Sequence, residues 1–231
     1  MNRQADDIPK AVLFDLDGTL VDTAPDLACA TNALRREHGL EPLPHDEIRR
    51  EVSNGGSALV TLALGLEKQA PGHDDARAML LEYYGQNVAE KSCLFEGFSE
   101  VLDRYRSMRR PWGIITNKPR QYAVPLLEAL EVMPDVLLCA DDLPVKKPDP
   151  APLLEAARRL NVAPQHCWYI GDHLRDIQAA NNAGMTAIAV TYGYLRQEDT
   201  PDTWPASRFF ETPAALCRVL LQHDAFDTTE A

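Results

Sequence analysis

The sequence is poor in positive charge, and this shortage limits its possible partners. Among 231 residues, 23 Lys and Arg stand against 35 Asp and Glu, which gives a formal net charge of −12. Such a field repels the phosphate backbone of nucleic acids and anionic membrane surfaces, so we expect neither as a partner. If the substrate is itself an anion, positive charge must be concentrated locally, and a divalent cation is the natural candidate.

Targeting segments and cysteine frameworks are also missing. No apolar stretch follows the N-terminal MNRQADDIPK, so we expect no secretory signal and a cytoplasmic protein. The longest uncharged run, 177–195, contains Gln178, Asn181 and Asn182, which argues against a membrane helix. The five cysteines are scattered and form no C-x-x-C pair, so we expect reduced thiols rather than disulfides or a zinc cluster.

The remaining composition, 45% hydrophobic and 25% charged, is that of an ordinary folded protein, and the pattern along the chain predicts its class. Apolar runs that suit buried strands lie at 11–14, 112–116, 136–140, 167–170 and 187–190. Segments with helical spacing lie between them, at 98–108, 122–130, 152–160 and 175–183. This alternation predicts an α/β fold with a doubly wound, Rossmann-like parallel sheet covered by helices on both faces.

The first two strands are separated by residues 15–111, far more than an ordinary crossover needs. The segment SNGGS at 53–57 predicts a flexible break between helices. We therefore predict an all-helical cap domain at 24–93, inserted into a sheet domain made of 1–23 and 94–231. Helical spacing recurs in the predicted cap over 24–39, 58–64 and 74–89.

Four carboxylates follow two of the predicted strands directly. Asp15 and Asp17 come after the first strand and lead into Gly18, which permits a tight turn. Asp172 and Asp176 come after the fourth strand, spaced as on one face of a helix near its N-terminus. A helix cap would explain Asp172 alone, but not acidic residues at two strand ends, the edge where open α/β sheets bind ligands. Hard oxygen ligands with few histidines select Mg²⁺ over zinc.

Groups that suit a phosphate follow the other strands. Thr116 and Asn117 bring a hydroxyl and an amide to the same edge of the sheet. Lys147 precedes a proline that stiffens the backbone, so its ammonium would be held over the crevice as a point charge for phosphate. We expect Lys118 and Lys146 to be solvated, as loop lysines usually are.

Together these residues resemble the four motifs of the haloacid dehalogenase superfamily, in order and with suitable spacing. DLDGTLVD occupies 15–22, ITN 115–117, KPDP 147–150 and GDHLRD 171–176. More narrowly, the chain resembles the phosphoglycolate phosphatase group, in which a helical cap follows the first motif. The resemblance implies that the first strand is central and flanked by the second and fourth, which brings the motifs to one switch point.

The resemblance also implies how these residues act. Asp15 would be the nucleophile and form an aspartyl-phosphate. Asp17 would protonate the leaving alcohol and then deprotonate the water that breaks this intermediate. Thr116, Asn117 and Lys147 would hold the phosphoryl oxygens, so the implied enzyme is a phosphomonoesterase.

A Mg²⁺ ion completes the implied site. Its ligands would be Asp15, the main-chain carbonyl of Asp17, and Asp172. Asp176 would orient the phosphate-binding lysine or a water on the metal. His173 departs from the commonest family pattern, in which a small hydroxyl residue follows the fourth-motif aspartate, so its contact with metal, substrate or cap is left open.

Substrate choice in capped members of this family lies in the cap. We expect the segment 53–57 to make this contact, with Asn54, Gly55 and Gly56 meeting the substrate, and a plain loop between helices is the alternative. Two small phosphate esters fit the resemblance: N-acetylmuramic acid 6-phosphate and 2-phosphoglycolate. The stretches 191–204 and 112–119 resemble the bacterial branch that acts on the first ester in cell-wall recycling, and we favour that branch.

Rival activities can be weighed from single residues. A haloacid dehalogenase has no need of Asp17, because it protonates no alcohol. A phosphonatase needs a cap lysine that forms an imine, and neither Lys68 nor Lys91 lies in an apolar helix that would lower its pKa. A phosphomutase shares every core residue and remains the nearest enzymatic rival, whereas a non-catalytic phospho-ligand-binding module is the alternative from another class.

Motion and assembly are less determined by the sequence. Cap opening is expected because water must be excluded during the attack on phosphorus and admitted for hydrolysis. The hinges would lie near Thr23 and Cys93. The sequence QHDAFDTTEA after Leu221 predicts a disordered tail. The oligomeric state is left open between monomer and homodimer.

Overall fold

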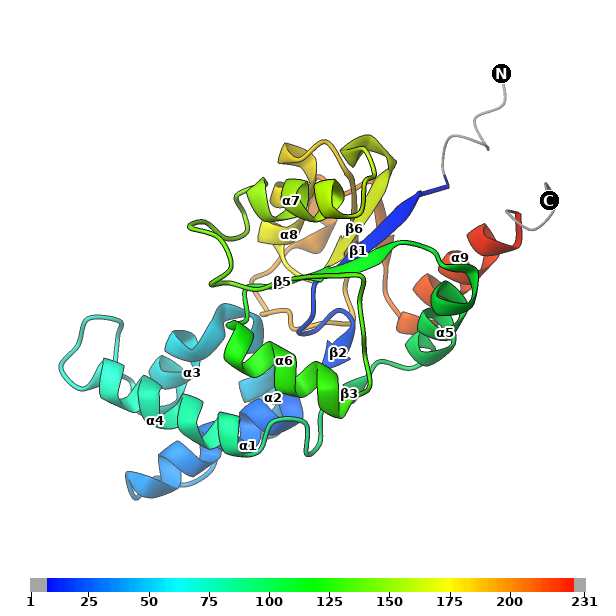
Figure 1. The fold of residues 1–231 in the computed structure, drawn as a ribbon. Helices are drawn as coiled ribbons and strands as arrows, with labels where there is room; N and C mark the ends of the chain where they lie inside the picture. The colour runs from blue at the N-terminus through cyan, green and yellow to red at the C-terminus, as the bar shows by residue number, and fades with distance from the viewer. Residues whose placement is uncertain (1–7, 227–231) are drawn as a thin grey trace.

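The structure is a computed structural model in which residues 8–226 are described. Its main element is a six-stranded parallel sheet with the strand order β5-β4-β1-β6-β7-β8 (Figure 1). The strands are β1 (Ala11–Phe14), β4 (Trp112–Ile115), β5 (Val136–Leu138), β6 (Cys167–Gly171), β7 (Thr186–Val190) and β8 (Arg208–Phe210). The predicted parallel sheet is therefore confirmed, with β1 between β4 and β6 as the family resemblance implied. The edge strand β8 was not predicted.

Different helices cover the two faces of the sheet, which makes the fold doubly wound. Side chains alternate along β1, so Val12 and Phe14 join one hydrophobic cluster while Ala11 and Leu13 join the other. The first cluster includes residues of α5 (Phe98–Met108), α6 (Arg120–Ala129) and α9 (Pro213–Phe226). The second includes residues of α7 (Ala151–Arg159) and α8 (Leu174–Asn182).

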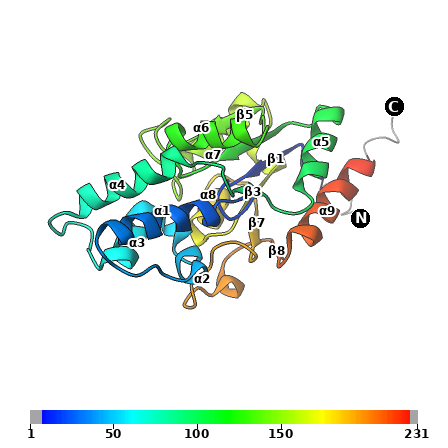
Figure 2. The same cartoon turned by 90° about the horizontal axis from the view of Figure 1, so that it is seen from below.

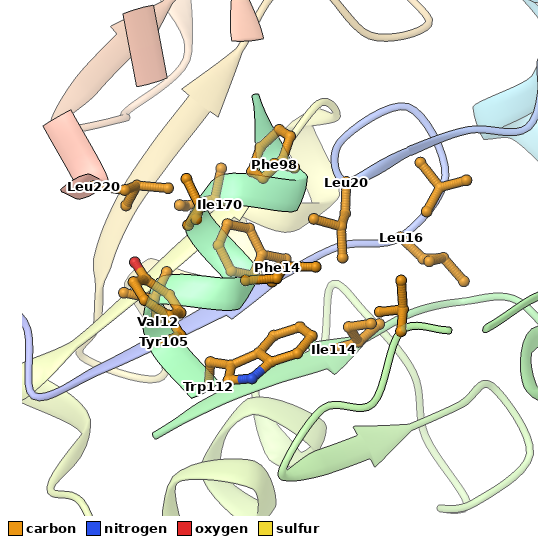
Figure 3. Packing of buried hydrophobic residues seen from close by; sticks show 14 of the residues in the cluster. Val12, Phe14, Leu16, Leu20, Phe98, Tyr105, Trp112, Ile114, Ile170 and Leu220 are labelled. Carbon is orange, nitrogen blue, oxygen red and sulfur yellow. The ribbon is translucent and has the colours of Figure 1, made fainter. Parts of the chain in front are cut away.

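Aromatic packing anchors the central strand in the first cluster. Figure 3 shows Phe14 between Phe98 of α5 and Trp112 of β4. The ring centroids of Phe14 lie 5.8 Å from Phe98 and 6.3 Å from Trp112, both with edge-to-face geometry. Burial of such a side chain contributes about 1.5–3 kcal/mol, and each aromatic pair adds about 0.5–1.5 kcal/mol. The strand that carries Asp15 at its end is thus fixed by the core.

Four helices that follow β1, within residues 24–86, form a third hydrophobic cluster, which Tyr194 also joins. They are α1 (Ala24–Glu37), α2 (His45–Arg49), α3 (Gly55–Leu64) and α4 (His73–Gln86). Leu34, Leu59 and Leu80 lie at the centre of this cluster and are fully or almost fully buried. Figure 2 shows α1, α3 and α4 gathered at one end of the molecule and α5 and α9 at the other.

A short antiparallel pair joins these helices to the sheet. It consists of β2 (Val21–Asp22) and β3 (Cys93–Leu94), in which Asp22 pairs with Cys93. The predicted cap boundaries, after residue 23 and before residue 94, fall at this pair. Short 3-10 turns complete the described elements, at Val52–Asn54, Pro164–His166 and Pro201–Thr203.

Two local predictions are wrong. The SNGGS segment is not a flexible break, because its first part lies in a 3-10 turn and α3 begins at Gly55, whose φ of +80° turns the chain into the helix. Disorder after Leu221 is contradicted as far as Phe226, where α9 ends, because Leu216 and Leu220 anchor this helix in the core. The last five residues lie outside the described part. Within residues 8–226, no helix is both long and apolar enough to cross a membrane.

Candidate active site

Asp15 and Asp17 lie where β1 ends. The amide of Asp15 donates to the carbonyl of Ile170 at 2.8 Å, so the β1–β6 pairing continues up to this residue. The next turn passes close to the second acidic motif. A Cβ atom on Gly18, whose φ is +79°, would lie 2.3 Å from Oδ2 of Asp172, so only glycine fits there.

Lys147 lies inside the carboxylate cluster with 1% of its side chain exposed. Its Nζ is 2.8 Å from Oδ1 of Asp15 and 2.8 Å from Oδ1 of Asp176. It also donates to the carbonyl of Ile115 at 2.8 Å and to the hydroxyl of Tyr169 at 2.7 Å. Burial alone would lower the pKa of Lys147, but the two carboxylates outweigh it and raise the pKa above its usual range. The lysine is therefore a fixed positive charge at the end of β1.

Asp176 holds this lysine in place. Besides the ion pair, its Oδ2 accepts from the amide of His173 at 3.1 Å. His173 is the N-cap of α8, and its Nδ1 accepts from the amide of Arg175 at 3.2 Å. Its ring stacks on Trp204, with the centroids 6.5 Å apart. Burial and then Arg175 lower the pKa of His173 to about 4, so the ring is neutral at neutral pH.

Asp172 has the properties expected of a metal ligand. Its Oδ2 accepts from the hydroxyl of Ser53 at 3.0 Å and from the amide of Tyr194 at 2.9 Å. Its Oδ1 is buried and has no hydrogen-bond partner among the described residues. Oxygens of Asp15, Asp172 and Asp176 lie within 4.8 Å of one another.

The pKa values of Asp172 and Asp15 also agree with a cation-binding site. Burial, followed by the neighbouring carboxylates, raises the pKa of Asp172 to about 8. Burial likewise raises the pKa of Asp15 to about 6, although Lys147 opposes the shift. Crowded carboxylates of this kind, with Oδ1 of Asp172 left without a partner among the described residues, fit a hard divalent cation such as Mg²⁺.

Lys118 corrects a sequence prediction. It is not solvated, because only 7% of its side chain is exposed and its Nζ lies 2.8 Å from Oδ1 of Asp17. The ring of Tyr84, from α4, covers it with the centroid 4.6 Å from Nζ. The same carboxylate oxygen accepts from the hydroxyl of Thr23 at 2.6 Å. Lys146, by contrast, is exposed as expected.

The predicted phosphate ligands after β4 lie at the same place. Thr116 is 3% exposed, and its Oγ1 accepts from the amide of Lys118 at 3.0 Å. The side-chain amide of Asn117 donates to the carbonyl of Lys147 at 3.0 Å, so it fixes the lysine loop. A cavity of about 50 Å³ joins these groups to the cap, and its lining is Asp15, Asp17, Val52, Ser53, Thr116, Asn117, Lys118, His173 and Arg175.

The cap side of this cavity agrees only in part with the expected contact segment 53–57. Val52 and Ser53 line it, whereas Asn54, Gly55 and Gly56 are not among its lining residues. The side-chain amide of Asn54 instead faces Arg196, and with the amide turned to satisfy both of its atoms its oxygen accepts from Nε of Arg196 at 2.9 Å.

Further side chains of the site escaped the sequence analysis. Tyr169 lies within the buried strand β6, and Tyr194 lies in the loop after β7. Nothing in the local sequence pattern indicates that either residue belongs to the site. Ser53, by contrast, belongs to the SNGGS segment that the sequence predicted as the cap contact.

Comparison with known proteins agrees with this geometry. Residues 12–190 match the family described as haloacid dehalogenase-like hydrolase. The chain is 40% identical over 213 residues to the N-acetylmuramic acid 6-phosphate phosphatase of Pseudomonas aeruginosa, covering 91% of this chain and 94% of that protein. It is 39% identical over 210 residues to the phosphoglycolate phosphatase of Xanthomonas campestris pv. campestris, covering 90% and 95%.

A solved structure extends the likeness to the fold. The structure described as a predicted phosphoglycolate phosphatase from Haemophilus somnus 129PT has a TM-score of 0.79 and 26% identity, covering 91% of this chain and 97% of that one. The chain therefore belongs to the haloacid dehalogenase-like hydrolases. Within this family it is a phosphatase, a hydrolase of phosphoric monoesters.

Proposed function

We propose that the chain is a Mg²⁺-dependent phosphatase that hydrolyses N-acetylmuramic acid 6-phosphate in preference to 2-phosphoglycolate, through an aspartyl-phosphate on Asp15. The relatives from Pseudomonas and Xanthomonas bear the names of these two activities, and the first covers the chain at slightly higher identity. The observation that carries the proposal is the Asp15 carboxylate, paired with the buried Lys147 and open to a cavity between sheet and cap.

The side chains can carry out both halves of such a reaction. With a pKa of about 6, Asp15 is mainly ionised at neutral pH, and its oxygen would attack phosphorus while the ester oxygen leaves. Asp17 would give a proton to that oxygen and later take one from the water that cleaves the acyl phosphate. Lys147 and Thr116 would hold the phosphoryl oxygens, and the reaction would return Asp15 unchanged with phosphate and alcohol released.

Mg²⁺ fits the acidic residues of this site. Asp15, Asp172 and the main-chain carbonyl of Asp17 would hold it, because both oxygens of Asp176 are engaged by Lys147 and His173. When bound, the ion would supply the positive charge that offsets repulsion between a carboxylate nucleophile and a phosphate dianion.

The size of the cavity supports a cap that opens. Sites for small molecules usually measure about 300–1,000 Å³, whereas this cavity is about 50 Å³, so a sugar phosphate cannot enter while the cap is closed. We propose that residues 24–93 move as the cap, with hinges near Thr23 and Cys93. Asn54, Gly55 and Gly56 would then meet the substrate only in another cap position. The cytoplasmic location and the choice between monomer and homodimer stay predictions.

The test is phosphate release with Mg²⁺ from three esters: N-acetylmuramic acid 6-phosphate, 2-phosphoglycolate and p-nitrophenyl phosphate. Asp15→Asn should lower the rate by about 10³-fold or more, because it removes the nucleophile. Asp75→Asn, at an exposed cap position, serves as the matched control and should leave the rate unchanged. Muramic acid 6-phosphate turned over no faster than p-nitrophenyl phosphate would refute the substrate preference, and an active Asp15→Asn would refute the intermediate.

A further inference from the structure

Tyr194 belongs to the sheet domain by sequence but to the helical cap by packing. It follows β7 in the chain, yet its ring lies in the hydrophobic cluster of α1–α4 and is 1% exposed. The guanidinium of Arg49, from α2, lies 4.6 Å from the ring centroid. One side chain of the sheet domain is therefore built into the core of the cap.

The main chain of Tyr194 contacts the acidic centre. Its amide donates to Oδ2 of Asp172 at 2.9 Å. The preceding glycine allows this approach, because a Cβ atom on Gly193 would lie 2.4 Å from Cβ of Asp172. The cap residue Ser53 donates to the same carboxylate oxygen at 3.0 Å, so Asp172 is held from both domains.

The hydroxyl of Tyr194 contacts the start of the first cap helix. It accepts from the amides of Thr23 at 2.6 Å and Ala24 at 3.0 Å, and it donates to Oδ1 of Asp22 at 2.7 Å. The same oxygen of Asp22 accepts from Arg49 at 2.7 Å. The Thr23 side chain does not cap α1, because it donates to Asp17 instead. The tyrosine thus satisfies amides that a helix start leaves without an internal partner.

We propose that Tyr194 is a positioning residue that links cap closure to Asp172. Its amide donates to the carboxylate of Asp172 in the sheet domain, and its hydroxyl is bonded to the amides of Thr23 and Ala24, at the proposed hinge of the cap. Opening about Thr23 changes the hydroxyl contacts, whereas the amide contact stays within the sheet domain. The hydroxyl therefore stabilises the closed position of the cap, while the amide of the same residue holds Asp172. This inference rests on the proposed function only in that turnover is taken to require a closed cap.

Tyr194→Phe tests the role, because it removes the hydroxyl and keeps the ring. Amide hydrogen exchange at Thr23 should become about tenfold faster, since this amide loses its acceptor, whereas Ala24 keeps Oδ1 of Asp22 at 3.4 Å as a second acceptor and should change less. With N-acetylmuramic acid 6-phosphate and Mg²⁺, KM should rise about tenfold while kcat changes less than about twofold, because the closed complex is weakened and the reacting groups are untouched. Tyr192→Phe is the matched control: its hydroxyl donates to the carbonyl of Thr19 at 2.8 Å, away from the helix start.

The two readouts separate the possible failures. Unchanged exchange at the Thr23 amide, or an equal rise in KM in Tyr192→Phe, overturns the role of Tyr194. Wild type without phosphatase activity would contradict the proposed function, while the exchange result would still decide this inference. If Tyr194→Phe does not fold, Asp22→Asn removes the charge that the Tyr194 hydroxyl and Arg49 share, and it must speed exchange at the Thr23 amide for the inference to stand.

Discussion

Replacement of Lys147 by methionine is the sharpest test of how the acidic centre is held together. Methionine keeps an unbranched side chain of similar length but removes the ammonium that lies 2.8 Å from both Asp15 and Asp176. The side chains of these partners are 14% and 0% exposed, so water cannot replace the lost charge fully. Removing one partner of a buried ion pair costs about 3–5 kcal/mol, against a total stability of about 5–15 kcal/mol for a typical domain.

The stability lost in Lys147→Met should depend on pH, and the carboxylates determine whether it grows or shrinks as the pH rises. An unfolded Asp has a pKa near 4, whereas burial raises that of folded Asp15 to about 6. Between about pH 4 and about pH 6, Asp15 is therefore protonated in the folded state and ionised in the unfolded state. The stability that this proton contributes is lost as the pH rises through the folded pKa of about 6. Without Lys147 the folded pKa rises further, so the variant should lose more stability at about pH 8 than at about pH 5.

Urea unfolding in the presence of a chelator, at both pH values, measures this directly. Lys146→Met is the matched control, because Lys146 is the exposed neighbour in the same loop and its removal should change stability by less than about 0.5 kcal/mol. A Lys147→Met protein as stable as the control at about pH 8 would refute the electrostatic account. An equal loss at both pH values would refute the titration argument alone.

Two further predictions concern the metal and the cap. Because the pKa values of Asp15 and Asp172 are raised to about 6 and about 8 in the metal-free protein, folded carboxyls hold protons that Mg²⁺ must displace, so Mg²⁺ should raise Tm more at about pH 8 than at about pH 5. A rise independent of pH in differential scanning fluorimetry would contradict this. Arg196 of the sheet domain pairs with Glu51 beside the cap turn, so Arg196→Glu should lower kcat/KM about fivefold by opposing closure. Combination with Glu51→Arg should restore it, and a double variant no better than the single one would show that the pair does not hold the cap.

The parts predicted well from sequence are those that local pattern determines. The run AVLF is buried at all four positions and forms β1, and the helical spacing at 98–108 gives α5 with the same bounds. The carboxylates after β1 and β6 are brought together because parallel strands place their carboxyl ends at one edge. Motif order and strand burial therefore gave the centre of the site without any knowledge of the cap's position.

The parts missed depend on contacts distant in sequence or on weak local signals. Lys118 is buried because Tyr84 of the cap lies over it, which no pattern around residue 118 contains. The five-residue helix α2 has one buried residue, Ile48, which is too little for a period to be visible. The edge strand β8, with Phe209 exposed, lacks the continuous apolar run of a central strand.

The acidity of the chain has a specific consequence at this site. The buried centre contains the carboxylates of Asp15, Asp172 and Asp176 but a single paired ammonium, that of Lys147, so two negative charges remain uncompensated there when all groups are ionised. Burial, and then the neighbouring carboxylates, raise the pKa values of Asp15 and Asp172 in the metal-free protein, and protonation of these groups removes the excess charge. The charge of a divalent cation equals this excess of two negative charges. An anionic ester approaching this centre is repelled until its carboxylates are neutralised, so the proposed metal dependence follows from the charge distribution of the site.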